Sequence, residues 1–177
     1  ASEVMQKKMV PIESSIKTMD TCGTGGDGKN SLNISTATAF VLAAAGIPIA
    51  KHGNKALTSK CGSADVLEAL GVNINLEVSK LEKCIKEIGI CFMFAPNHHP
   101  AMKHVGPVRQ QLGIRTIFNM LGPLLNPANA KNQLVGVYSK DVFKIYREVF
   151  DQDKEKNICL VYGYDGNDEI SLDGLNL

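Results

Sequence analysis

Two segments rich in glycine and hydroxyl side chains hold the residues of this chain that are best suited to chemistry. Residues 20–36 contain the run Gly23-Thr24-Gly25-Gly26-Asp27-Gly28-Lys29, and residues 51–63 combine Lys51 with two further lysines and several hydroxyls. Glycines allow backbone N–H groups to approach an anion closely, and hydroxyls and lysines add donors that fit phosphate oxygens. A helix beginning at Ser35 or Thr36 would direct its unpaired N–H groups at the same point. Together the two segments predict a phosphate-binding site.

The first segment nearly matches the nucleotide-binding P-loop. Asn30 follows Lys29, however, where that motif needs a serine or threonine to hold magnesium. An NTPase also needs an apolar strand that ends in a magnesium-binding aspartate, and the sequence has no clear strand of that kind. These departures argue against an NTPase. The occurrence of two phosphate-type loops together is still a specific signal for a phosphate-binding site.

Several acidic, arginine and histidine residues outside these two segments have both a structural and a functional interpretation. The adjacent carboxylates Asp168 and Glu169 could be solvated turn residues, or could hold magnesium together with substrate phosphates. Arg109 could pair with an acidic side chain, or could grip a carboxylate with two hydrogen bonds. For His98 and His99 we favour hydrogen bonding or helix capping over zinc, because adjacent histidines point apart and no cysteine sits at ligand spacing.

Composition restricts the class of protein and partner. The 177 residues are 44% hydrophobic and 21% charged, which is typical of one globular domain. The formal net charge of +1 does not indicate binding to nucleic acid or to an anionic membrane. Five cysteines without a CxxC pair are expected to be reduced thiols. The longest apolar run, at 37–50, is interrupted and too short to cross a bilayer. We therefore expect a cytoplasmic protein with small-molecule partners and no membrane or nucleic-acid partner.

Predicted strands and helices alternate along the chain. Apolar runs predict strands at 16–20, 47–50, 90–95, 133–138 and 157–163. Helices are predicted at 35–45 (apolar on all sides and therefore buried), at 64–70, from a capping box at Ser79 to Gly89, from Pro107, and around 142–149. This order predicts an α/β fold with a mainly parallel sheet and helices on both faces. Ligands of such folds collect at the carboxyl ends of the strands.

The motifs as a set resemble the anthranilate phosphoribosyltransferases, the tryptophan-pathway members of the nucleoside-phosphorylase-like phosphoribosyltransferases. The resemblance runs in order over nearly the whole chain from Thr18. Its stretches are Gly23-Thr-Gly-Gly-Asp27, Asn33-Ile-Ser-Thr36, Lys51-His-Gly-Asn54, Gly62-Ser-Ala-Asp-Val-Leu-Glu68, His99-Pro-Ala-Met-Lys103, Val108-Arg109, Leu112-Gly-Ile-Arg-Thr-Ile-Phe-Asn119, Leu121-Gly-Pro-Leu124 and Asp168-Glu-Ile-Ser171.

The resemblance implies transfer of a 5-phosphoribosyl group from phosphoribosyl diphosphate to the amine of anthranilate, with release of diphosphate and use of Mg²⁺. It implies a diphosphate-sugar site formed by Gly23, Gly26, Asp27, Ser31, Asn33, Ile34, Ser35, Thr36, Lys51, His52, Gly53, Asn54, Lys55, Ala56, Leu57, Thr58, Ser59 and Ser63. The implied magnesium ligands are Ser35, Asp168 and Glu169. The implied anthranilate contacts are Gly23, Asn54, His99, Arg109 and Pro123, and the catalytic residues are Lys51, Asn54 and Arg109.

The chain departs from the family pattern in two respects. Lys55 stands where the family commonly has arginine, which keeps the charge but loses a bidentate fork. Family members also carry an N-terminal helical domain that contributes to dimer contacts, and their α/β domain continues beyond the end of this sequence. We therefore expect residues 1–177 to be a partial α/β catalytic domain, truncated at both ends, of a protein that forms a homodimer.

Two alternatives stay open at this point. A pyrimidine nucleoside phosphorylase would share the fold and a lysine- and serine-rich phosphate loop. A non-catalytic paralogue would bind phosphate-rich ligands or nucleic acid. Residues 99–119 and the pair Asp168-Glu169 favour the transferase over the phosphorylase, and the net charge of +1 counts against nucleic acid.

Overall fold

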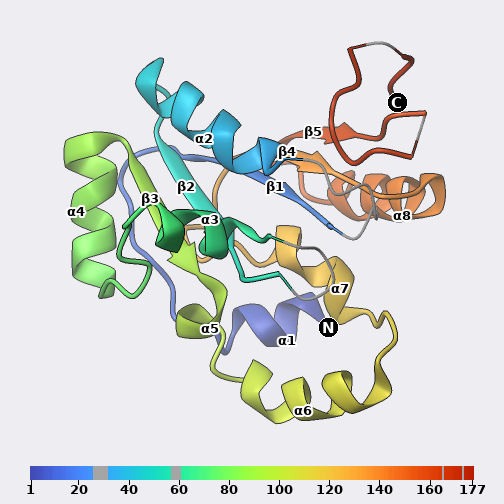
Figure 1. Cartoon of the computed structure of the whole chain (residues 1–177), viewed down its shortest axis with the longest axis horizontal. Coiled ribbons are helices and arrows are strands. Elements are labelled where there is room, and N and C mark those ends of the chain that lie inside the picture. Colours follow the sequence, from blue (N-terminus) through green and yellow to red (C-terminus); the bar gives the residue numbers. More distant parts are fainter. Residues whose placement is uncertain (26–31, 57–60, 165, 173) are drawn as a thin grey trace.

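Five parallel strands form one sheet in the order β3-β2-β1-β4-β5 in the computed structural model, which describes residues 1–25, 32–56, 61–164, 166–172 and 174–177 (Figure 1). The strands are β1 (Met19–Gly23), β2 (Ile49–Gly53), β3 (Ile90–Phe94), β4 (Asn132–Gly136) and β5 (Asn157–Val161). The chain leaves β1 toward β2 and β3, and later returns to the other side of β1 with β4. The direction of winding therefore switches between β1 and β4, which is where open α/β sheets place their ligands.

The first two strands lie two to three residues later than the sequence indicates. The predictions at 16–20 and 47–50 are wrong in position, because β1 pairs with β4 up to Gly23 and β2 pairs with β3 up to Gly53. The starts of both phosphate-type segments therefore belong to the sheet. Lys51 and His52 consequently lie on a central strand and are almost completely buried.

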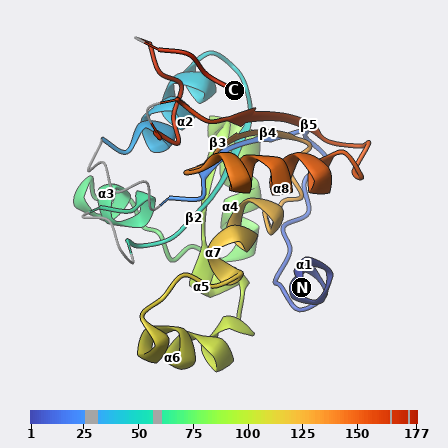
Figure 2. The ribbon, with the colours of Figure 1, turned by 90° about the vertical axis from the view of Figure 1, so that its right-hand side faces the viewer.

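Helices cover both faces of the sheet (Figure 2), as the alternating pattern predicts. Side chains of one strand alternate between faces, so Phe92 packs with α3 whereas Cys91 and Met93 pack with α4. Val135 packs with α8, and α2 lies against β1 and β2. The helices are α1 (Ser2–Gln6), α2 (Ile34–Ala44), α3 (Ser63–Ala69), α4 (Val78–Ile88), α5 (Ala95–His98), α6 (Met102–Leu112), α7 (Phe118–Leu121), the 3₁₀ helix η1 (Gly122–Leu124) and α8 (Lys140–Phe150).

Three local predictions about helices are wrong. The capping box at Ser79 does not form, because α4 begins one residue earlier and Glu82 instead accepts a hydrogen bond from the backbone N–H of Glu13 at 3.1 Å. Pro107 lies inside α6 rather than at its start. The apolar α2 is not fully buried: one side of the helix, with Thr36 and Ala39, lies against the sheet, whereas Val41 is 68% exposed.

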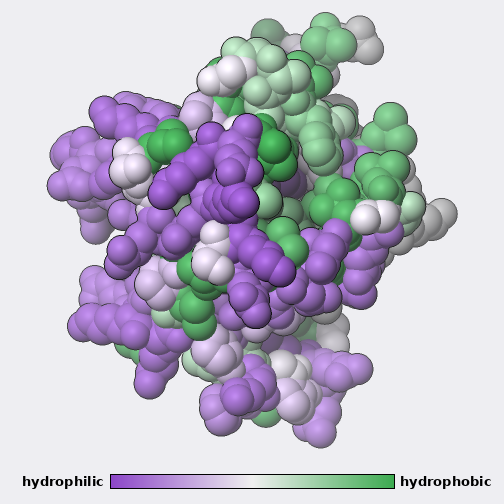
Figure 3. Space-filling view, turned by 90° about the vertical axis from the view of Figure 1, so that its left-hand side faces the viewer, coloured by the Kyte–Doolittle hydropathy of each residue, from purple (hydrophilic) through white to green (hydrophobic). Residues whose placement is uncertain are grey.

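On the face that Figure 3 shows, the surface over α4 differs from the surface over α2. Figure 3 shows hydrophilic side chains over α4 and hydrophobic surface toward the top, where α2 lies. Among the described residues, no helix is long and apolar enough to cross a bilayer. All five cysteines are free thiols.

Candidate active site

Two glycines at the carboxyl ends of β1 and β4 allow Asp168 to lie against the sheet. Gly23 and Gly136 are partners in the register of these strands. A Cβ on Gly23 would lie 2.9 Å from Oδ2 of Asp168, and a Cβ on Gly136 would overlap the Asp168 carbonyl oxygen. The segment that carries the Asp168-Glu169 pair therefore packs directly on the switch point of the sheet, in a space that larger residues would fill.

The N-terminus of α2 faces the same end of the sheet. Asn33 is the N-cap, and its Oδ1 accepts hydrogen bonds from the backbone N–H of Thr36 at 3.3 Å and from the Thr36 hydroxyl at 2.6 Å. The hydroxyl of Thr21 in β1 donates to the Ser35 carbonyl at 2.8 Å and ties the helix to the strand. This geometry holds Ser35 at the edge where the predicted phosphate site lies.

Lys51 of β2 connects β1 with the N-terminus of α2. Its ammonium donates to the Thr21 carbonyl and to the Ser35 hydroxyl, the latter at 3.3 Å. Burial lowers the pKa of Lys51; the negative charge of Asp20 is the main influence that opposes this effect, and that of Glu169 is a weaker one. Lys51 thus contacts Ser35 directly and lies within electrostatic range of Glu169, although Ser35 and Glu169 are far apart in the sequence.

Asp20 is a buried counter-charge that the sequence patterns do not single out. Its Oδ1 accepts the backbone N–H of His52 at 3.2 Å, and its Oδ2 accepts the Asn126 amide at 2.7 Å. Burial raises the pKa of Asp20, and the neighbouring Lys51 is the main opposing influence. Asn126 also donates to the Ala50 carbonyl at 2.9 Å, so the network fixes β2 beside β1. One sequence signal could have identified Asp20: it ends the strand predicted at 16–20 and directly precedes the glycine-rich segment.

A cavity of about 590 Å³ opens beside these residues. All five of the residues that the family resemblance assigns to anthranilate line it, including Arg109 from α6 and Pro123 from η1. The Arg109 guanidinium lies 5.6 Å from the centre of the Phe118 ring, and Gln133 of β4 donates to the Pro123 carbonyl at 2.9 Å. The lining residues are Cys22, Gly23, His52, Gly53, Asn54, Ala95, Pro96, His99, Pro100, Met102, Lys103, Arg109, Phe118, Leu121, Gly122, Pro123 and Leu125.

Two histidines pair in the wall of this cavity. Nε2 of His99 lies 3.1 Å from Nε2 of His52, so one ring donates and the other accepts. Burial, reinforced by the charges of neighbouring histidines, lowers the pKa of His52 to about 3 and that of His99 to about 4. Both rings are therefore neutral near pH 7, and they give the cavity a polar but uncharged wall.

The structure separates the remaining predicted phosphate contacts into three groups. Lys55 is half-exposed, and its ammonium lies 2.7 Å from a carboxylate oxygen of Glu68 in α3. Gly53 and Ser63 lie against each other, because a Cβ on Gly53 would overlap the Ser63 hydroxyl. The predicted contacts Gly26, Asp27, Ser31, Leu57, Thr58 and Ser59 lie outside the described residues.

The chemistry of the side chains fits magnesium at the Ser35–Glu169 edge. Ser35 and the Asp168-Glu169 pair offer only oxygen ligands, which Mg²⁺ prefers. Because Gly23 and Gly136 have no side chains, the segment with the two carboxylates has room beside the sheet. Within the described part of the chain, no three histidine, cysteine or acidic side chains gather as a cage for a metal. A site with few protein ligands is usual for magnesium that also binds substrate phosphates.

The chain is similar in sequence to curated enzymes of one kind. Anthranilate phosphoribosyltransferases from Laribacter hongkongensis and Burkholderia mallei are 55% and 53% identical over 168 and 179 residues, which cover 95% and 100% of this chain. The chain spans about half the length of these curated relatives, 49% and 52%. Over nearly its whole length the chain therefore resembles these relatives, as the motifs indicate.

Solved structures give the same result for the fold. Anthranilate phosphoribosyltransferase from Thermus thermophilus matches with a TM-score of 0.91 and 41% identity over 99% of this chain and 56% of that chain. The Saccharomyces cerevisiae enzyme in complex with PRPP and Mg matches with a TM-score of 0.90 and 33% identity, over 100% and 53%. A family model described as "Glycosyl transferase family, a/b domain" matches residues 15–177. The chain therefore belongs to the glycosyl transferase family, with residues 15–177 matching the family's α/β domain.

Proposed function

We propose that the protein containing this chain transfers the 5-phosphoribosyl group of phosphoribosyl diphosphate to the amine of anthranilate and releases diphosphate. The observation that carries the proposal is the position of Gly23. It lines the cavity with Arg109 and Asn54, and it also lies against Asp168 at the edge that holds Ser35. One residue thus borders both an acceptor cavity and a phosphate edge, as transfer between two bound substrates requires.

The proposed acceptor cavity suits anthranilate. Arg109 supplies a guanidinium for the carboxylate, and Phe118 and Pro123 supply apolar walls for the ring. The neutral His52–His99 pair adds polarity without a charge that would compete with Arg109. We therefore assign Arg109 and Asn54 to orienting the amine over C1 of the ribose.

The proposed phosphate edge suits the leaving group. In the reaction, the amine nitrogen bonds to C1 while the C1–oxygen bond to diphosphate breaks, and the amine loses one proton. Negative charge grows on the diphosphate, and we assign its stabilisation to Lys51 and the N-terminus of α2, which meet at Ser35. Ser35, Asp168 and Glu169 are the residues that would hold Mg²⁺, which when bound neutralises diphosphate charge.

The test is a fluorescence assay of anthranilate consumption by the full-length gene product that contains this sequence. The proposal expects consumption that requires both phosphoribosyl diphosphate and Mg²⁺, with one diphosphate released for each anthranilate. Folded protein that leaves anthranilate unchanged but cleaves thymidine in phosphate would support a pyrimidine nucleoside phosphorylase instead. Binding of DNA at low salt without any turnover would support a non-catalytic paralogue.

The biological setting follows from the family resemblance. We infer that the reaction serves tryptophan synthesis in the cytoplasm and that the active protein is a homodimer. Light scattering on the full-length gene product tests the dimer directly, and a monomer at assay concentration would contradict it.

A further inference from the structure

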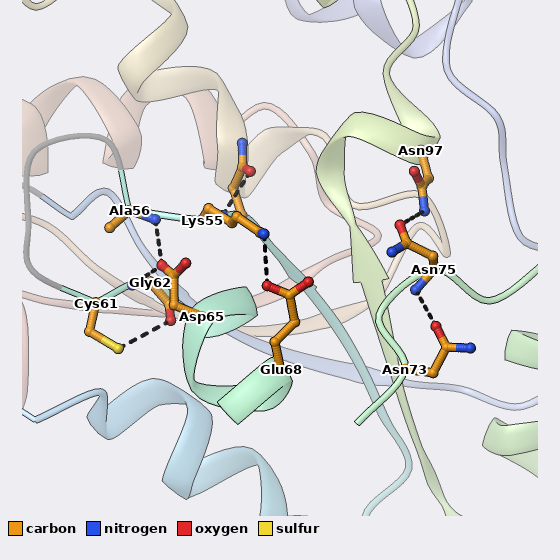
Figure 4. Close-up of polar contacts among 10 residues, drawn as sticks. Lys55, Ala56, Cys61, Gly62, Asp65, Glu68, Asn73, Asn75 and Asn97 are labelled. Carbon is orange, nitrogen blue, oxygen red and sulfur yellow. Dashed lines mark hydrogen bonds and ion pairs between the residues drawn. The ribbon is translucent and has the colours of Figure 1, made fainter. Parts of the chain in front are cut away.

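One carboxylate oxygen joins two points within the second phosphate-type segment, residues 51–63 (Figure 4). Oδ2 of Asp65, in the first turn of α3, accepts the backbone N–H of Ala56 at 2.8 Å and that of Gly62 at 2.8 Å. These two residues are six positions apart in the sequence, and Asp65 brings their amides to a single point. Charge-assisted hydrogen bonds of this length are stronger than those between neutral groups.

The same contact region holds Asn54 in place. The backbone N–H of Ala64 donates to the Asn54 carbonyl at 3.2 Å, and the Ser63 hydroxyl lies 3.5 Å from the same oxygen. The side-chain oxygen of Asn54 accepts the backbone N–H of Lys55 at 2.8 Å. Asn54 also lines the cavity, and its carbonyl is held by Ala64 and Ser63 rather than by Asp65.

Close packing leaves this region little freedom. A Cβ on Gly62 would lie 2.5 Å from the Ala56 nitrogen and 2.6 Å from the Asn54 carbonyl oxygen. The two backbone segments are therefore in direct contact, and any larger residue at Gly62 would push them apart. Displacement of either segment would be transmitted to the other.

The charge state of Asp65 fits this role. Hydrogen bonds from the backbone N–H groups of Ala56 and then Gly62 lower the pKa of its carboxyl. The carboxylate is thus the form that the backbone stabilises. By contrast, the nearby Lys55–Glu68 ion pair is half-exposed, with 49% and 41% of the two side chains accessible, and such pairs contribute little.

We propose that Asp65 is a positioning residue for the proposed transfer reaction, holding Ala56 in the geometry that binds phosphoribosyl diphosphate. It is not among the residues that line the cavity, and it acts through the amides of Ala56 and Gly62. This inference rests on the proposed function, and it goes beyond it by assigning a role to a residue outside the cavity and the phosphate edge.

The test compares Asp65→Ala, Asp65→Asn and the control Glu68→Gln in the full-length gene product. Asp65→Ala should raise the KM for phosphoribosyl diphosphate about tenfold, while the KM for anthranilate changes by less than about threefold. Asp65→Asn should recover most of this loss, because an amide oxygen can accept both N–H groups. Glu68→Gln, on the same helix, should stay within about twofold of wild type.

A purely structural role would lower the melting temperature and the amount of active enzyme while leaving both KM values unchanged. That result in folded Asp65→Ala, or equal KM defects in the alanine and asparagine variants, would overturn the proposal. If Asp65→Ala does not fold, Asp65→Ser, whose shorter side chain cannot reach both amides, decides by the same split between the two KM values.

Amide hydrogen exchange separates failure of this inference from failure of the proposed function. Loss of Asp65 should speed exchange at Ala56 and Gly62 by about tenfold or more. The amides of Leu70 and Val72, which donate to Val66 and Leu67 at the far end of α3, should not change. Wild-type protein without turnover would contradict the proposed function, whereas unchanged exchange at Ala56 and Gly62 would contradict the role of Asp65.

Discussion

Replacing Gly136 by alanine tests whether the packing of Asp168 on the sheet is required for activity. A Cβ at this position would overlap the Asp168 carbonyl oxygen and lie 2.8 Å from its carbonyl carbon, whereas ordinary contact begins at 3.4 Å. Gly136 is held in register with β1 and β5 on both sides. Asp168 belongs to a segment without a helix or strand, so we expect that segment, rather than the sheet, to move.

The expected size of the effect follows from this overlap. The Asp168 carbonyl must shift by about 1 Å or more to restore van der Waals contact. A shift of that size in a positioned group costs about 100-fold in rate. Overpacking itself costs about 1–3 kcal/mol in a rigid core, and less where a surface segment can yield. Gly136→Ala should therefore keep its fold, lose a few degrees of melting temperature and lose most of its turnover.

The assay is steady-state turnover of the full-length gene product during a titration with Mg²⁺. Gly136→Ala should lower kcat by about 100-fold and raise the Mg²⁺ concentration needed for half-maximal rate. Gly106→Ala in α6 is the matched control, because a Cβ there meets nothing within 4 Å. Wild-type kcat and wild-type magnesium dependence in folded Gly136→Ala would refute the reasoning.

Three further predictions address the cavity, the carboxylate pair and the histidines. Arg109→Ala should raise the KM for anthranilate by about 100-fold and that for phosphoribosyl diphosphate by less than about threefold; equal changes would contradict a carboxylate grip. Asp168→Asn combined with Glu169→Gln should abolish the magnesium dependence together with most activity, and an unchanged titration curve would contradict the assignment. Because burial lowers the pKa of His52 to about 3 and of His99 to about 4, their stabilisation is complete above about pH 6.5 and is lost as the pH falls. The free energy of unfolding, measured with urea, should drop by about 2 kcal/mol for each histidine at about pH 5, and a flat profile would contradict it.

The fold was accessible from the sequence because its signals are local. Apolar runs of strand length alternate with helices that carry ordinary start and stop residues, and these features predict the parallel sheet correctly. The positions of the first two strands were not accessible. Thr21 to Gly23 and Lys51 to Gly53 read as loop because of their polar side chains and glycines, yet they pair within the sheet.

The site was only partly accessible for the opposite reason, since its contacts are long-range. The Asp20–Asn126 hydrogen bond joins residues 106 positions apart, and neither residue carries a motif of its own. The overlap of Gly136 with Asp168 depends on a chain segment that returns to the sheet after β5. Patterns along the chain identify the phosphate-type loops, whereas the partners that hold them are set by topology.

The most direct test of the central claim is a crystal structure of the full-length gene product with phosphoribosyl diphosphate, Mg²⁺ and an unreactive anthranilate analogue. The account predicts the analogue's carboxylate on Arg109 within the cavity, diphosphate beside Lys51 and Ser35, and the metal beside Glu169. An analogue bound outside the cavity, or diphosphate bound away from Lys51, would contradict the proposal that these two sites meet at Gly23.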